Sequence, residues 1–273
     1  MARSGGRLAR LARLRASSFG TLAQGTLRFD ESIEAVVAHV REGLAALCAR
    51  GLREDLPEHE TGLTQTLVTE LESRVGYRPY FFQQEHLENV RSGKSPRVDI
   101  AVQARGDHPV VVSGVLGNGD RFFSLEAKRL PTPGTGRERE YVAGTRGAIE
   151  RYKLGLHGRG LRCVGIIGYV QNRTFSFWRD AVNGWVDELQ ADSASRSKWD
   201  EYDKLQMEYS TLRLAQLRSA SLRQSDDVRV TIRHLWVLLG QPSLSSGGTR
   251  ARRARRDVRK APKSDGRGRS RSM

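Results

Sequence analysis

The sequence predicts an α/β fold in which a mixed central β-sheet is flanked by helices. Three observations carry this prediction. Apolar residues recur at helical spacing across residues 32–52, apolar and polar residues alternate across residues 97–102, and residues 164–170 are almost entirely apolar. An uninterrupted apolar run of that length is typical of a strand that is buried on both faces.

The remaining elements follow from spacing and from chain breakers. Pro57 separates the first helix from a second one over about residues 58–75, and the aromatic run 80–82 indicates a strand. Residues 121–129 form another strand after a turn at 117–120, and residues 138–156 predict a helix whose inner face includes Leu156. Three further elements complete the domain: a helix at about 175–190 and strands at 211–217 and 228–239.

The excess positive charge lies at the two ends of the chain. The formal net charge is +15, of which residues 1–28 contribute +6 and residues 249–273 contribute +9. Residues 29–248 therefore carry no net charge. We expect a basic and flexible arm over 1–28, a folded domain over 29–240 and a disordered basic tail over 241–273. Basic arms favour polyanions, and a solvated tail without a partner is the alternative.

Cysteine content and hydropathy exclude several classes of protein. Only Cys48 and Cys163 are present, which rules out a disulfide scaffold and a four-cysteine zinc site. No apolar run approaches the length of a spanning helix, so no membrane partner is expected. We expect a cytoplasmic protein of the bacterial type. Organellar targeting by residues 1–28 is the alternative, because they contain arginine and serine but no acid.

Three charged residues lie on predicted strands at positions where their side chains could meet. Asp99 lies inside the apolar strand 97–102, and Glu126 and Lys128 lie two positions apart on the strand 121–129. Residues two apart on a strand face the same side, so Glu126 and Lys128 point together. If the two strands pair, the carboxylates of Asp99 and Glu126 meet. An exposed ion pair of Glu126 with Lys128 on a solvated sheet face is the alternative interpretation.

Converging carboxylates with a neighbouring lysine suit one kind of chemistry. Two carboxylates form a hard oxygen site for Mg²⁺, for which Mn²⁺ could substitute. The metal can present water as a nucleophile, and the lysine can orient that water or offset charge that develops on a phosphate. Glu60, on the preceding predicted helix, could contribute to a second metal or to a bound water, or could simply cap that helix.

The strings PRVDI at 96–100 and FSLEAK at 123–128 resemble the motif of the PD-(D/E)xK nuclease superfamily, which has the restriction-endonuclease-like fold. The predicted order helix, strand, strand, strand, helix, strand is similar to its αβββαβ core. The resemblance covers about residues 58–171. It implies that Asp99, Glu126 and the Ala127 carbonyl bind the metal, that Lys128 serves the water and that Glu60 is auxiliary.

The resemblance also implies phosphate contacts on the helix after the motif, from Arg146, Arg151 and Lys153; a solvated helix face is the alternative. In the tail, four arginines are candidate nucleic-acid contacts: Arg252, Arg253, Arg255 and Arg256. The expected function is a Mg²⁺-dependent nuclease in restriction or anti-phage defence, with DNA favoured as substrate and endonuclease action favoured over exonuclease action. A homodimer and a subunit of a larger defence complex remain open, and a non-catalytic nucleic-acid- or partner-binding module is the second hypothesis.

Overall fold

The computed structural model describes residues 29–89, 91–92, 94–106, 111–112, 114–134, 136–144 and 146–240. The expected N-terminal arm at 1–28 and the expected tail at 241–273 lie outside these residues. The four candidate arginines of the tail, Arg252, Arg253, Arg255 and Arg256, lie outside them as well. The described residues all lie within the range 29–240, over which the sequence predicts a folded domain.

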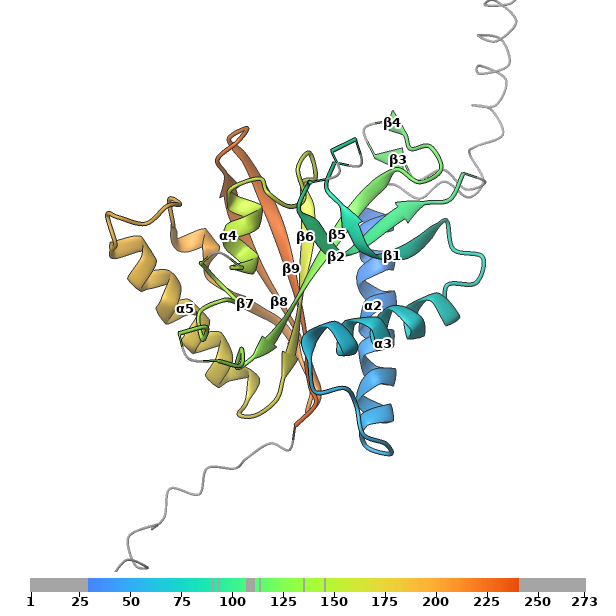
Figure 1. Cartoon of the computed structure of the whole chain (residues 1–273), viewed down its shortest axis with the longest axis horizontal. Helices are drawn as coiled ribbons and strands as arrows, with labels where there is room; N and C mark the ends of the chain where they lie inside the picture. Colours follow the sequence, from blue (N-terminus) through green and yellow to red (C-terminus); the bar gives the residue numbers. More distant parts are fainter. Residues whose placement is uncertain are drawn as a thin grey trace, which may run out of the picture. The chain divides into compact units, whose positions relative to one another are not determined.

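A seven-stranded mixed sheet organises this domain (Figure 1). Its spatial order is β1-β2-β5-β6-β9-β8-β7. The strands β1, β2 and β5 pair antiparallel, β5, β6 and β9 pair parallel, and β9, β8 and β7 pair antiparallel. The bounds are β1 Tyr80–Leu87, β2 Arg97–Ala104, β5 Arg121–Leu130, β6 Cys163–Val170, β7 Gln206–Ser210, β8 Leu214–Arg223 and β9 Val228–Leu238.

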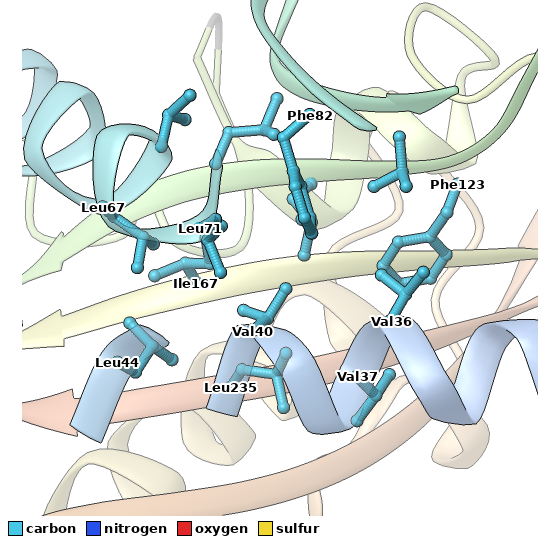
Figure 2. Close-up of a cluster of buried hydrophobic side chains, with 14 of the residues drawn as sticks. Val36, Val37, Val40, Leu44, Leu67, Leu71, Phe82, Phe123, Ile167 and Leu235 are labelled. Carbon is cyan, nitrogen blue, oxygen red and sulfur yellow. The ribbon is translucent and has the colours of Figure 1, made fainter. Parts of the chain in front are cut away.

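One face of the sheet is covered by the helices α2 (Phe29–Gly51) and α3 (Glu60–Ser73). The apolar stripe that the helical spacing predicts in α2 is buried against the strands. Figure 2 shows Val40 and Leu44 of α2 beside Leu67 of α3, with Phe123 of β5 and Ile167 of β6 on the sheet side. Burying such side chains removes about 25 cal/mol of unfavourable hydration per Å² of apolar surface, so this layer fixes both helices on the sheet.

The opposite face carries the short helix α4 (Ala148–Lys153) and the helix α5 (Phe175–Ala191), which Figure 1 places on the other side of the sheet from α2 and α3. Trp178 and Val182 of α5 pack in the same core cluster as Trp236 of β9. Because β6 contributes residues to both clusters, it is buried on both faces, as its apolar run predicts.

The helix predicted at 138–156 is shorter in the structure. Only Ala148–Lys153 is helical, and residues 138–147 form turns. Gly144 has φ +105°, a left-handed conformation that interrupts a helix, and the backbone of Gly147 lies so close to Ala143 that a Cβ would be 2.5 Å from Ala143 Cα. Leu156 was predicted on the inner face, which is wrong, because it is 45% exposed.

The C-terminal strands also differ from the sequence-based prediction. The predicted strand 211–217 is the first part of β8, which continues to Arg223, and β7 was not predicted at all. The strand β7 is mostly exposed, so its residues lack the alternation that marks a half-buried strand. A separate two-stranded ribbon of β3 (Val111–Val112) and β4 (Gly114–Val115) lies in the segment between β2 and β5.

The predicted order of elements is present between residues 60 and 170. Along the chain, α3 is followed by β1, β2 and β5, then by α4 and β6, with the ribbon β3–β4 inside the connection from β2 to β5. The fold class is therefore α/β with a mixed sheet flanked by helices, as predicted. Among the helices that the structure describes, none is long and apolar enough to cross a membrane.

Candidate active site

The pairing of β2 with β5 brings Asp99 and Glu126 together. The antiparallel register sets Ile100 opposite Leu125, so one further step sets Asp99 opposite Glu126. Directly opposite residues on an antiparallel pair project to the same face. In addition, Oδ2 of Asp99 accepts a hydrogen bond of 2.7 Å from the backbone N–H of Ala127. The two carboxylates that the sequence places on separate strands therefore form one site.

The carboxylate of Glu126 is fully buried and is held by two basic side chains. Its Oε2 accepts a hydrogen bond of 3.3 Å from Nη1 of Arg151, and its Oε1 contacts Nδ1 of His157. Burial alone would raise the pKa of Glu126. The hydrogen bond and charge of His157, together with the charges of Lys128 and Arg151, outweigh burial and lower the pKa. Glu126 is therefore ionised at neutral pH.

The environment of Asp99 acts in the opposite direction. Burial and, after it, the neighbouring negative charge of Glu126 together raise the pKa of Asp99 to about 7, against the lowering effects of Lys128 and of the Ala127 N–H. Two adjacent carboxylates disfavour simultaneous ionisation unless positive charge is added. A strongly shifted carboxyl beside a second carboxylate is a feature of functional sites.

Lys128 and Glu60 complete the cluster from two different elements. Nζ of Lys128 lies 3.2 Å from Oε1 of Glu60, the first residue of α3, and the backbone N–H of Arg129 donates to Oε2 of Glu60 at 3.0 Å. Burial lowers the pKa of Lys128, but the charges of Glu60, Glu126 and Asp99 outweigh it and raise the pKa. Lys128 is therefore a protonated ammonium that is only 5% exposed.

His157 is the member of the site that sequence analysis missed. It lies in the loop after α4 and is 2% exposed. The next residue, Gly158, is fixed by Oε1 of Glu88, which accepts its N–H at 2.9 Å, and by Nη1 of Arg223, which donates to its carbonyl at 2.8 Å. No spacing pattern marks a single histidine in a glycine-containing loop, so only the tertiary structure could find it.

The three candidate phosphate contacts near α4 have different surroundings. Arg146 is exposed and free to meet a ligand, whereas Arg151 turns inward to Glu126. The prediction for Lys153 is wrong. Its side chain is fully buried in an ion pair with Asp203, with Nζ 2.7 Å and 2.8 Å from the two carboxylate oxygens, and 4.7 Å from the centroid of the Trp199 ring. A nucleic acid cannot reach Lys153, and its role is structural.

Within the described part of the chain, no three side chains of histidine, cysteine, aspartate or glutamate are grouped to hold a metal ion. The pair of Asp99 and Glu126 nonetheless suits Mg²⁺, which is usually bound through one or two carboxylates while it keeps several waters. The oxygens of Glu126 each accept one hydrogen bond and retain a second lone-pair site. The pKa of Asp99 is raised first by burial and then by the negative charge of Glu126, and a divalent cation at this place would favour the ionised form of both carboxylates.

Comparisons of the chain with family models, with curated proteins and with solved structures find no match. We call the resulting cluster the acidic site. It consists of Glu60, Asp99, Glu126 and Lys128, together with Arg151 and His157, which contact Glu126.

Proposed function

We propose that the protein is a Mg²⁺-dependent nuclease that hydrolyses phosphodiester bonds, with DNA as the favoured substrate and endonuclease action favoured. One observation carries the proposal. Asp99 and Glu126, from two paired strands, lie together beside the ammonium of Lys128, whose partner is Glu60 on α3. These residue types in one place suit phosphoryl transfer, which depends on positioning and on electrostatic stabilisation.

The topology supports the same proposal. An antiparallel run of β1, β2 and β5, continued by the parallel strand β6 after a helical connection, agrees with the αβββαβ order of the restriction-endonuclease-like fold. The acidic site lies on the second and third strands of that run. We therefore propose membership of the PD-(D/E)xK superfamily, with Asp99, Glu126 and the Ala127 carbonyl as the metal ligands.

The chain's own residues would act as follows. Mg²⁺ bound at Asp99 and Glu126 would supply a Lewis acid for the scissile phosphate and lower the pKa of water. The protonated ammonium of Lys128 stabilises negative charge that develops on phosphate oxygens rather than acting as a base. Glu60 fixes the position of that ammonium, and Arg151 with His157 keeps Glu126 ionised and in place.

Substrate affinity would come from cations outside the acidic site. Arg146 is exposed near α4, and the two terminal segments hold all of the net positive charge of the chain. Such contacts give affinity that depends on salt and not on base sequence. We therefore propose a nuclease that gains specificity from a second copy or from a partner in a larger complex, in a restriction or anti-phage defence setting in the cytoplasm.

A second candidate function rests on the contacts of Glu126. Because Arg151 and His157 already hold both of its oxygens, the site has charge compensation without a metal. The same fold would then hold nucleic acid or a protein partner without cutting. The two functions differ in whether Mg²⁺ binds and whether the loss of one carboxylate abolishes activity.

The test measures cleavage of plasmid and linear DNA with Mg²⁺ or Mn²⁺. The full chain is compared with Asp99→Asn, which keeps the size of the side chain and removes a like charge beside Glu126, and with Lys128→Gln. Asp55→Asn and Lys198→Gln are matched controls at exposed positions. Thermal melting verifies that each variant is folded, and calorimetry measures Mg²⁺ binding.

Metal-dependent cleavage that both site variants lose and both controls keep supports the nuclease. Cleavage of linear DNA alone would point to exonuclease action. Binding of Mg²⁺ that Asp99→Asn abolishes, without cleavage, supports the same metal site in a protein that needs a partner. A folded protein that neither cleaves nor binds Mg²⁺ rejects the nuclease and leaves the binding module.

A further inference from the structure

A second charged feature lies on the other face of the sheet. A pocket of about 480 Å³ opens where β6 and β9 begin, beside the first turns of α2. The register pairs Cys163 with Thr231 and Arg218 with Arg233, so these side chains share the face that α2 covers. The lining residues are Asp30, Ile33, Glu34, Arg162, Cys163, Arg218, Arg229, Thr231 and Arg233. We call this the arginine pocket.

Four arginines meet only two carboxylates in this lining. Arg233 pairs with Glu34 at 2.8 Å and with Glu208, outside the lining, at 3.6 Å, and Arg229 pairs with Asp200, also outside the lining, at 2.9 Å. Arg162 and Arg218 are exposed, and neither has a side-chain hydrogen bond or ion pair to any residue that the structure describes. Two guanidinium groups in the lining of one pocket are therefore available to bind an anion.

The other lining groups favour the same class of ligand. Arg233 is only 8% exposed, and its Nε is buried without a hydrogen-bond partner among the described residues. Thr231 adds a hydroxyl donor. Burial raises the pKa of Cys163 to about 12, against the lowering effect of Arg233, so its thiol is neutral and adds no negative charge. Guanidinium groups match phosphate oxygens through paired N–H donors.

We propose that the arginine pocket binds a phosphate group, with Arg162 and Arg218 as its principal contacts. The group could belong to a small phosphorylated molecule or to a phosphodiester of a nucleic acid, since the donors recognise the same oxygens. The pocket volume falls in the range of small-molecule sites, so a mononucleotide would fit. The proposal does not depend on the acidic site, whose strand residues Asp99, Glu126 and Lys128 project from the opposite face of the sheet.

The experiment titrates the full chain at low ionic strength with four probes: inorganic phosphate, adenosine monophosphate, a dinucleotide with one phosphodiester, and acetate as a carboxylate control. The variant is Arg162→Ala with Arg218→Ala; both residues are exposed, so folding should be unaffected. The matched control is Arg91→Ala with Lys94→Ala, which removes two exposed cations elsewhere. Any anion binding by the terminal segments would be the same in all three proteins and would cancel in the comparison.

We expect at least one phosphate-bearing probe to bind the double variant about tenfold or more weakly than the wild type, with the control unchanged. Inorganic phosphate or the mononucleotide as the sensitive probe would identify a phosphorylated small molecule, and the dinucleotide alone would identify a nucleic-acid phosphodiester. Equal binding to wild type and variant overturns the proposal. An equal loss in the control, or an equal response to acetate, overturns it too, because either shows general attraction of anions.

Discussion

Replacing Lys153 by methionine separates the structural role of this residue from a role in binding nucleic acid. The ammonium makes two contacts with Asp203, at 2.7 Å and 2.8 Å, and both side chains are fully buried. Methionine has a similar length and no charge. In the variant, Asp203 retains the hydroxyl of Ser221 and the backbone N–H of Asp200 as hydrogen-bond donors, but loses its ion-pair partner.

The magnitude follows from leaving a buried carboxylate without a cation. Breaking a buried ion pair by removing one partner costs about 3–5 kcal/mol, because the remaining charge stays desolvated. A domain of ordinary stability has about 5–15 kcal/mol in total, so the loss is a large share. At about 2–4 °C for each kcal/mol, the melting temperature should fall by about 10 °C. Replacing Asp203 by leucine in the same chain should recover most of the loss.

Urea unfolding and thermal melting of four proteins measure this effect: wild type, Lys153→Met, the double variant with Asp203→Leu, and Lys198→Met as an exposed control. DNA binding is measured at several salt concentrations in parallel. A Lys153→Met variant that keeps wild-type stability and instead lowers the salt dependence of DNA binding would contradict the structural role of Lys153. That outcome would return Lys153 to the surface role that its sequence position indicated.

Packing and titration give three further expectations. Gly168→Ala should lower the free energy of unfolding by about 1–3 kcal/mol, because the new Cβ would lie 2.3 Å from Cδ1 of buried Trp236. Gly184→Ala lies inside α5 with no atom within 4 Å of the new Cβ, so it should raise the free energy of unfolding by about 0.5–1 kcal/mol. Urea unfolding measures both variants, and equal effects would contradict the difference in packing. Burial lowers the pKa of His234 to about 3, so below pH 6.5 the unfolded chain takes up a proton that the folded chain does not. His234 should therefore contribute a loss of about 2 kcal/mol between pH 7 and pH 5, and a wild-type difference from His234→Gln that is the same at both pH values would refute this.

Local sequence patterns predicted most of the secondary-structure elements of the fold. The apolar stripe of α2 and the uninterrupted run of β6 each bury the residues that their spacing indicates. The patterns gave wrong predictions where a buried residue lies outside a helix or strand, or where a strand is exposed. Tyr141 and Val142 are buried as predicted but lie in turns rather than in a helix, and β7 forms by pairing with β8 although it is exposed. Apolar spacing reports burial, and burial alone does not determine the backbone.

The same limit applies to the acidic site. Alternation along β5 suffices to place Glu126 and Lys128 on one face, whereas the pairing of the Asp99 strand with β5 was a condition that only the structure could meet. The spacing of residues along the chain does not indicate which basic side chain pairs with which carboxylate. Arg151 and Lys153 lie two residues apart on one short helix, yet one turns to Glu126 and the other to Asp203.

The sequence by itself determined the α/β class, the order of strands and helices around residues 60–170, and the concentration of positive charge at the ends of the chain. These properties depend on periodicity and composition, which are local. The tertiary structure alone decided that His157 holds Glu126, that Lys153 is buried, and that Arg162 and Arg218 share a pocket. Those outcomes depend on contacts between residues distant in the chain, which no local period encodes.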